Sequence, residues 1–391
     1  MAAPRTVLLR AVAAQASVSI AQFVLPAIGP ELQEEYGLGL AGVGAVLTAS
    51  LLGSGLTLLP GGVVVDRYGS RLPLAIGTAF GAGGLAVAAF APSTAVLLVS
   101  LLVAGVGSGF VPIAGFGALM RAYDVTRRGF ALGIRQMAVP VGGLIASVLL
   151  PLLVRAGGVE LALLVCAGLV LVFGAGFAFV AEARPPVDRR PSIEVHRLIR
   201  APGMLRLLVV ATFYIVVLQA VLAFTVPSVR DSGFSALVAG AVFFVLNATA
   251  AVARIVWGRI ADLEGGSRRV RSLVEAGLLG AAGGVVFTLA LHAGPAALVV
   301  AMILFAFGAL GWNALVYVSA GEKAPPELAA QAVGIAATLI FVVSAVSTPP
   351  MGALAAAVGW DWFWLTCAGL LGIGAAVALT LPPGVRAPAP E

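Results

Sequence analysis

Long apolar runs, separated by short charged or Pro/Gly-containing stretches, constrain this chain more than any other feature of its sequence. A membrane-spanning helix needs about 20 mostly apolar residues, and twelve runs are candidates. They are predicted at Val7–Ile28, Leu40–Val64, Leu72–Phe90, Ala95–Met120, Gly129–Val154, Val159–Ala181, Leu205–Val226, Ala236–Ile260, Ser272–His292, Ala296–Ala320, Leu328–Val358 and Trp362–Leu381. Only 10% of the 391 residues are charged, against about 25% in soluble proteins. The sequence therefore predicts an all-α integral membrane protein.

A polar segment divides the runs into two groups of six. It extends over residues 182–203 and is rich in Arg and Pro. We expect one six-helix bundle in residues 1–181, a linker at 182–203, and a second six-helix bundle in residues 204–391. Within the linker, residues 192–200 predict a short basic amphipathic helix on the membrane surface. The first run continues past the small residues that could form a signal-peptide cleavage site, so it is expected to be a retained helix.

Positive charges are concentrated in alternate loops. One set carries Arg67/Arg71, Arg121/Arg127/Arg128, the linker, and Arg259/Arg268/Arg269/Arg271. The opposite set carries few basic residues, and its first member contains Glu31, Glu34 and Glu35. Because basic loops stay in the cytoplasm, both termini and the linker are expected there. The net charge of +6 thus reports membrane topology, and the scarcity of charge excludes a nucleic-acid partner.

Several classes of function lack the residues they need. The chain has no deep pair of carboxylates, no nucleophile with a histidine partner, and no phosphate-binding P-loop. Cys166 and Cys367 lie inside apolar runs and are expected to be core residues, and no metal-ligand spacing is present. The sequence predicts neither an enzyme nor a cofactor or metal site. Arginine greatly outnumbers lysine, as in proteins of GC-rich bacteria, so a bacterial cytoplasmic membrane is the expected location.

The loop after the second run contains an ordered set of Gly and charged residues. Gly62 comes four residues before Asp66, and Arg67, Gly69 and Arg71 follow. A glycine at this place lets a neighbouring helix approach closely. The carboxylate falls just before the next helix, where it would meet the positive end of a helix dipole. The alternative is that these are ordinary loop charges that follow the orientation rule.

A second copy of this loop occurs about half a chain later. Gly258 and Asp262 keep the same spacing, but Leu263 replaces the arginine and the basic residues shift to Arg268 and Arg269. The two copies resemble the signature loop of the major facilitator superfamily, which joins the second and third helices of each six-helix half. The resemblance implies twelve helices in two parallel bundles related by a pseudo-twofold axis. It also implies that the aspartates fasten the cytoplasmic side while the transporter opens outward, and the second fastening is expected to be the weaker.

The two halves show further weak similarities. Gly133 in the fifth run has a counterpart in Gly334 of the eleventh, and Pro151 has one in Pro350.

Two ionisable residues lie clearly inside the apolar runs, Arg135 in the fifth and Arg254 in the eighth. A charge at the centre of a membrane helix costs roughly 2.5–3.5 kcal/mol, so such residues are functional candidates. With no carboxylate deep in any run, a guanidinium facing a wet cavity would bind a carboxylate or another oxyanion. Asn247 lies two turns before Arg254 on the same helix face. The alternative is that either arginine extends to the membrane surface or holds a gate.

Arg254 precedes Gly258 by four residues. This offset resembles the eighth helix of organic-anion branches of the superfamily, such as monocarboxylate and oxalate–formate transporters. The resemblance implies that Arg254 binds the carboxylate of the substrate.

The remaining polar residues of interest lie in three runs that line the pathway in the resembled family. They are Gln15 and Gln22 in the first run, Tyr214 and Gln219 in the seventh, and Asn313 and Tyr317 in the tenth. Each is a candidate for substrate contact. Each is equally explained by a hydrogen bond between helices or by an interfacial aromatic ring.

Together these features predict a secondary active transporter of a small organic anion of the carboxylate type. It would work by alternating access as a monomer, either with protons or by anion exchange. The alternative within transport is efflux of an amphipathic drug-like compound, with the arginines as gate elements. A membrane sensor or scaffold that keeps the fold is a third possibility, disfavoured because no added soluble domain is evident.

Overall fold

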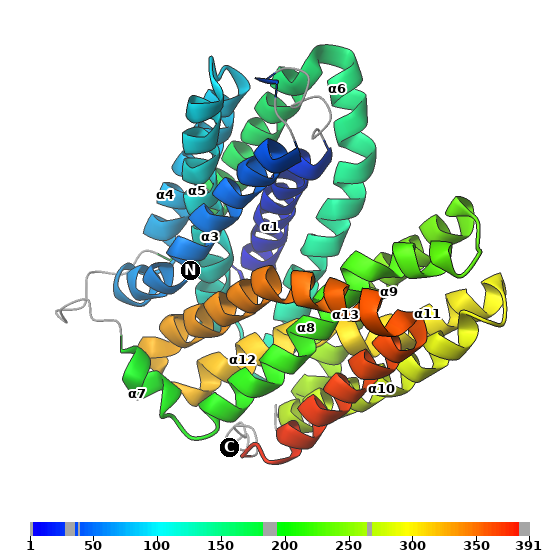
Figure 1. Ribbon diagram of the computed structural model, residues 1–391. Coiled ribbons are helices and arrows are strands. Elements are labelled where there is room, and N and C mark those ends of the chain that lie inside the picture. Colours follow the sequence, from blue (N-terminus) through cyan, green and yellow to red (C-terminus); the bar gives the residue numbers. More distant parts are fainter. Residues whose placement is uncertain (1–2, 28–35, 38–39, 183–193, 264–267, 383–391) are drawn as a thin grey trace. The chain divides into compact units, whose positions relative to one another are not determined.

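The computed structural model describes residues 3–27, 36–37, 40–182, 194–263 and 268–382. In these ranges the chain is almost entirely helical and contains no strand (Figure 1). The predicted all-α fold is therefore confirmed. The acidic residues Glu31, Glu34 and Glu35 and most of the predicted linker lie outside the described residues.

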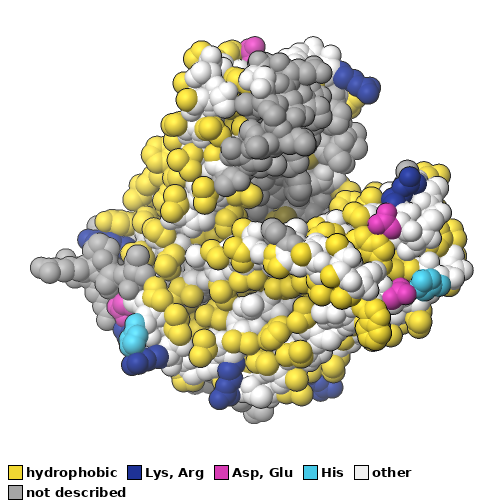
Figure 2. Space-filling view, viewed as in Figure 1, with side chains coloured by type: hydrophobic (Ala, Val, Ile, Leu, Met, Phe, Trp, Pro, Cys, Tyr) yellow, Lys and Arg dark blue, Asp and Glu magenta, His cyan; other side chains and the backbone are white. Residues whose placement is uncertain are grey.

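Eleven helical segments among the described residues are long and apolar enough to cross a membrane. The helix that corresponds to the first predicted run, α1 (Pro4–Ala27), has 24 residues but is not among the eleven. Hydrophobic side chains cover much of the visible flanks of the helices, and charged ones gather near helix ends (Figure 2).

The chain forms two compact units. The first contains Met1–Ala122, Ala138–Val195 and Pro325–Ile335. The second contains Tyr123–Met137, His196–Ala324 and Ala336–Glu391. Each unit therefore includes a short segment from the other half of the sequence. The proposed domains 1–181 and 204–391 remain a prediction.

The first unit is built mainly from α1, α3 (Leu40–Tyr68), α4 (Arg71–Ala89), α5 (Thr94–Ala122) and most of α6 (Arg128–Val180). Helices α3 and α4 both pack on α5. The contact with α4 depends on Gly107, because a Cβ atom there would collide with the backbone of Gly81. The 3₁₀ turn η3 (Pro326–Leu328) and the first turns of α13 (Ala329–Leu379) complete this unit.

The second unit contains α8 (Met204–Asp231), α9 (Ala236–Asp262), α10 (Arg269–Ala290), α11 (Pro295–Leu310), α12 (Asn313–Lys323) and most of α13. The 3₁₀ turn η1 (Val125–Arg127) and the first turns of α6 also belong to it. Gly308 of α11 approaches the backbone of Gly280 of α10 as closely as Gly107 approaches Gly81 in the first unit. This shared contact adds to the similarity between the two halves.

Two of the longest helices each contain two predicted runs. Helix α6 departs from helical geometry at Gly157 and Gly158, and α13 departs from it at Gly359. Gly158 has φ of 70° and Gly359 has φ of 78°, a left-handed conformation that glycine adopts without steric cost. These turns lie where the sequence predicted the breaks after Val154 and Val358.

The linker contributes one short helix, α7 (Val195–Ile199). Leu198 is buried, while His196, Arg197 and Arg200 are exposed. This amphipathic pattern matches the short surface helix predicted within residues 192–200.

Candidate functional site

The first signature loop holds the start of a distant helix. Both carboxylate oxygens of Asp66, in the last turn of α3, accept hydrogen bonds from backbone N–H groups, those of Ala330 at 3.0 Å and Gln331 at 2.8 Å. These N–H groups open α13, so the carboxylate lies at the positive end of that helix. Gly62 makes the approach possible, because a Cβ atom there would lie 2.7 Å from the Ala330 carbonyl oxygen.

The second loop repeats this arrangement in the second unit. Asp262, the last residue of α9, accepts hydrogen bonds from the N–H groups of Gly129 at 2.8 Å and Phe130 at 2.7 Å. These residues open α6. A Cβ atom on Gly258 would collide with the carbonyl of Gly129. The sequence predicted that each aspartate would meet the next helix along the chain; instead, each meets a helix that is remote in sequence.

The second copy also carries a buried group of charges. Arg269, 1% exposed, pairs with Asp262 at 3.2 Å and with Glu322 at the end of α12. Arg269 also donates to the carbonyl of Val125 at 2.6 Å, and Arg128 lies 3.7 Å from Glu322. The copy that the sequence predicted to be weaker therefore holds a buried network of ion pairs. Sequence reasoning missed Glu322 because it ended the tenth run at Ala320.

The basic residues of the first loop have different surroundings. Gly69 adopts a φ of 76°, which lets the chain turn from α3 into α4. The guanidinium of Arg67 lies 5.2 Å from the ring centroid of Tyr68. Arg71 begins α4, and its backbone N–H donates to the carbonyl of Glu182 at 3.1 Å.

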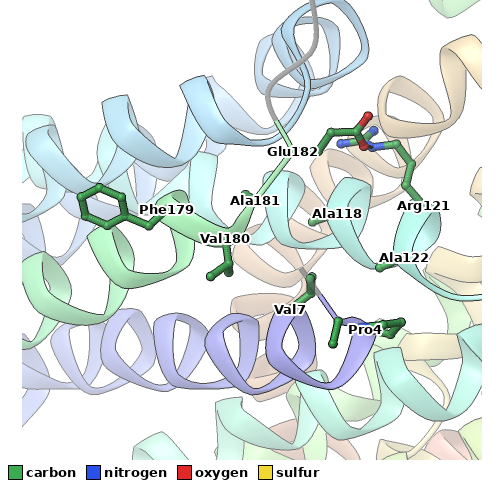
Figure 3. A pocket seen from close by; sticks show the side chains of 10 residues that line it. Pro4, Val7, Ala118, Arg121, Ala122, Phe179, Val180, Ala181 and Glu182 are labelled. Atoms are coloured by element: carbon green, nitrogen blue, oxygen red, sulfur yellow. Dashed lines mark ion pairs between the residues drawn. The ribbon is translucent and has the colours of Figure 1, made fainter. Parts of the chain in front are cut away.

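A cavity of about 720 Å³ lies in the first unit near the same helix ends (Figure 3). Its walls come from the start of α1 and the ends of α5 and α6, and they are mostly apolar. Arg121 at its margin pairs with Glu182 at 3.2 Å and donates to the hydroxyl of Ser70 at 2.6 Å. No residue predicted to bind substrate lines this cavity.

The two membrane arginines come together in the second unit. Gly133 of α6 has no side chain to separate it from the backbone of Arg254 in α9, so the two helices cross closely at this level. Arg254 is 7% exposed and Arg135 is fully buried. The phenol of Tyr317 from α12 lies within electrostatic range of both guanidinium groups.

Neutral groups hold Arg254 in place. Its Nη1 donates to the carbonyl of Gln136 at 2.8 Å, and its Nε donates to the carbonyl of Leu310 at 3.3 Å. Within the described ranges no carboxylate forms an ion pair with Arg254. Two peptide carbonyls orient the guanidinium but leave its net positive charge in place.

A break in the tenth predicted run supplies one of these carbonyls. Helix α11 ends at Leu310 and α12 begins at Asn313, so Gly311 and Trp312 interrupt the helix. Such a break frees carbonyls that would otherwise accept intrahelical hydrogen bonds. Side chains occupy three of them: the Trp257 indole donates to Phe307, the Trp312 indole to Ala309, and Arg254 to Leu310. The sequence predicted an uninterrupted run here.

The other candidate residues have varied environments. Asn313 is 8% exposed and begins α12, and its Oδ1 has no hydrogen-bond partner among the described residues. Asn247 is half-buried and donates to the carbonyl of Phe243 in its own helix. Gln219 is half-buried in α8. Tyr214 is fully buried and donates to the carbonyl of Leu273 at 2.7 Å, a contact typical of helix packing.

Gln15 and Gln22 lie on α1 in the first unit. Gln15 is buried and donates to the hydroxyl of Ser19 at 3.3 Å, whereas Gln22 is exposed.

Comparisons with known proteins agree with this architecture. Residues 11–348 match the Major Facilitator Superfamily. Over 370 residues the chain is 27% identical to an uncharacterized MFS-type transporter of Mycobacterium tuberculosis. This alignment covers 91% of this chain and 81% of that protein. A shorter match of 165 residues, also 27% identical, covers 41% of this chain and 37% of the probable sulfoacetate transporter SauU of Cupriavidus necator.

Solved structures show the same fold. The proton:xylose symporter XylE aligns with a TM-score of 0.79 at 14% identity, over 98% of this chain and 96% of that one. The human organic anion transporter MFSD10 aligns with a TM-score of 0.75 at 18% identity, over 97% of this chain and 100% of that one. The family carries small molecules across membranes and is not a family of enzymes. This chain belongs to the Major Facilitator Superfamily.

Proposed function

We propose that this protein is a secondary active transporter of a small organic anion of the carboxylate type. The observation that carries the proposal is Arg254, a buried guanidinium held by two neutral carbonyls and close to a second buried arginine, Arg135. The planar guanidinium of an arginine binds a carboxylate or sulfonate through two parallel charge-assisted hydrogen bonds. Such bonds are stronger than hydrogen bonds between neutral groups. Tyr317 and Asn313 would complete the polar contacts with the substrate.

Two of the similar proteins support this class of substrate. SauU is named as a probable sulfoacetate transporter and MFSD10 as an organic anion transporter. Sulfoacetate carries a carboxylate and a sulfonate, both of which a guanidinium recognises. The substrate of this protein would share that chemistry.

Transport would proceed by alternating access in a monomer of the cytoplasmic membrane, with both termini and the linker in the cytoplasm. Because no carboxylate lies deep in the predicted runs, the chain has no obvious proton carrier of its own there. Either a proton crosses together with the substrate or one anion exchanges for another. Symport predicts that a pH gradient drives uptake, and exchange predicts that an internal anion accelerates it.

Uptake by proteoliposomes tests the anion site. Arg254→Ala is expected to weaken uptake of small carboxylates and sulfonates at least tenfold, because a hydrogen bond to a charged group contributes about 1.5–3 kcal/mol. Arg254→Lys keeps the charge but loses the fork, so it should retain part of the activity. Arg271→Ala removes an exposed arginine and should transport as wild type does.

Thermal shift with the same compounds separates binding from folding. Small carboxylates should stabilise wild-type protein and lose this effect in Arg254→Ala. If Arg254→Ala takes up anions as well as the wild-type protein does, the assignment of Arg254 as the anion-binding residue is wrong. Stabilisation by lipophilic cations alone would instead favour drug efflux.

A further inference from the structure

A second opening in the first unit shares Phe179 with the cavity near Arg121. It is a groove of about 290 Å³ between α4 and the last turns of α6. Its walls are Arg71, Ala75, Thr78 and Ala79 from α4, and Leu171, Ala175, Ala178 and Phe179 from α6. Small-molecule pockets span roughly 300–1,000 Å³, so this groove has the size for one slender chain.

The two helices approach each other closely beside the groove. Gly174 of α6 lies so close to Thr78 of α4 that a Cβ atom on the glycine would collide with the threonine side chain. Alanines line the groove beside this crossing. Leu171 and Phe179, which are 52% and 77% exposed, form its outer edges. In a membrane transporter such an open apolar surface faces lipid acyl chains.

The polar groups of the groove have an order that matches an amphipathic ligand. Arg71 lies at the end where α4 begins, and its guanidinium has no ion-pair or hydrogen-bond partner among the described residues. The nearby carboxylate of Glu182 is engaged by Arg121. Thr78 lies seven residues further along α4, about 10 Å deeper. Thr78 is 3% exposed, and its hydroxyl has no hydrogen-bond partner among the described residues.

We infer that this groove binds one anionic phospholipid. The phosphate lies against Arg71, the acyl chain follows the alanines toward Leu171, and Thr78 donates its hydroxyl proton to an ester carbonyl. Charge complementarity selects the lipid, because a basic residue close to an anionic membrane surface attracts it. A zwitterionic lipid carries an ammonium group that offsets this attraction.

Native mass spectrometry of protein released from nanodiscs of phosphatidylglycerol and phosphatidylcholine tests the assignment. Wild-type protein is expected to retain one phosphatidylglycerol in preference to phosphatidylcholine. Arg71→Gln should lower that retention roughly fivefold, the equivalent of about 1 kcal/mol for one basic residue at an anionic surface. Ala175→Leu fills the groove without changing charge, and it should also displace the lipid.

The matched control is Arg155→Gln, which removes an exposed arginine of α6 sixteen residues before Leu171, the first groove residue of that helix. It should retain lipid as wild type does, and soluble glycerol phosphate should not displace the lipid. The inference is overturned if Arg71→Gln and Ala175→Leu retain phosphatidylglycerol normally. It is also overturned if phosphatidylcholine is held equally, or if the Arg155 control loses as much lipid. Because binding is read directly, none of these results depends on the proposed anion transport.

Discussion

Buried charge in the second unit is arranged in two different ways, residue by residue. Arg254 is held by neutral peptide carbonyls, whereas Arg269 is held by the carboxylates of Asp262 and Glu322. An arginine with a carboxylate partner is neutralised and contributes to structure. An arginine held only by carbonyls keeps its net charge and can attract an anion. This contrast separates the proposed binding residue from the structural one.

Glu322 is expected to be a main support of this structure. Its side chain is 7% exposed beside Arg269, and removal of one partner from a buried pair costs about 3–5 kcal/mol. Glu322→Gln should therefore lower the free energy of unfolding by several kcal/mol, measured by denaturant unfolding in detergent. Glu275→Gln is the control, because Glu275 also contacts two arginines but is 30% exposed. Exposed pairs contribute only about 0–1 kcal/mol, so equal losses would contradict the prediction.

The break between α11 and α12 is the element that shapes the arginine cluster. It frees the Leu310 carbonyl that orients Arg254, and it places Asn313 at the first turn of a new helix. Gly311 lets the break pack against α9, since a Cβ atom there would collide with the Trp257 ring. Discontinuous helices form substrate sites in other transporters. Here three side chains donate hydrogen bonds to the carbonyls freed by the interruption.

Gly311→Ala should therefore disturb both packing and the proposed site. Forcing an extra carbon into a packed contact costs typically 1–3 kcal/mol, so thermal unfolding in detergent should occur at lower temperature. Uptake should fall because Arg254 loses its orientation. Gly240→Ala is the matched control on α9, where an added Cβ atom meets no atom within 4 Å. The Gly240→Ala variant should have unchanged or slightly higher stability. If Gly311→Ala unfolds at the wild-type temperature and takes up anions normally, the contact with Trp257 tolerates a methyl group and the prediction is wrong.

The molecule as a whole repeats one polar contact in its two units. In each, an aspartate at the end of one helix accepts two N–H groups from the start of another, beside a glycine four residues earlier. In the second unit Asp262 also pairs with buried Arg269.

The repeated contact predicts that the same substitution destabilises both units. Asp66→Asn and Asp262→Asn should each lower the unfolding temperature, because each weakens charge-assisted hydrogen bonds to two backbone N–H groups, worth about 1.5–3 kcal/mol each. Asp262→Asn also removes the pair with buried Arg269. The two effects should add in the double variant, since the two aspartates lie in different units. Differential scanning fluorimetry of the three variants provides the measurement, and an unchanged unfolding temperature in either single variant would contradict the prediction.

The sequence alone determined the membrane class, most helix boundaries, the paired signature loops and the two buried arginines, because hydrophobic run length and residue spacing along one helix are local properties. The helix break was not predicted, since Gly311 and Trp312 fit an apolar run. Only the tertiary structure decided which helix each aspartate reaches, that Glu322 pairs with Arg269, and that carbonyls hold Arg254. Those contacts join residues up to 265 positions apart, and hydrophobic pattern carries no information about which distant backbone groups a side chain will meet.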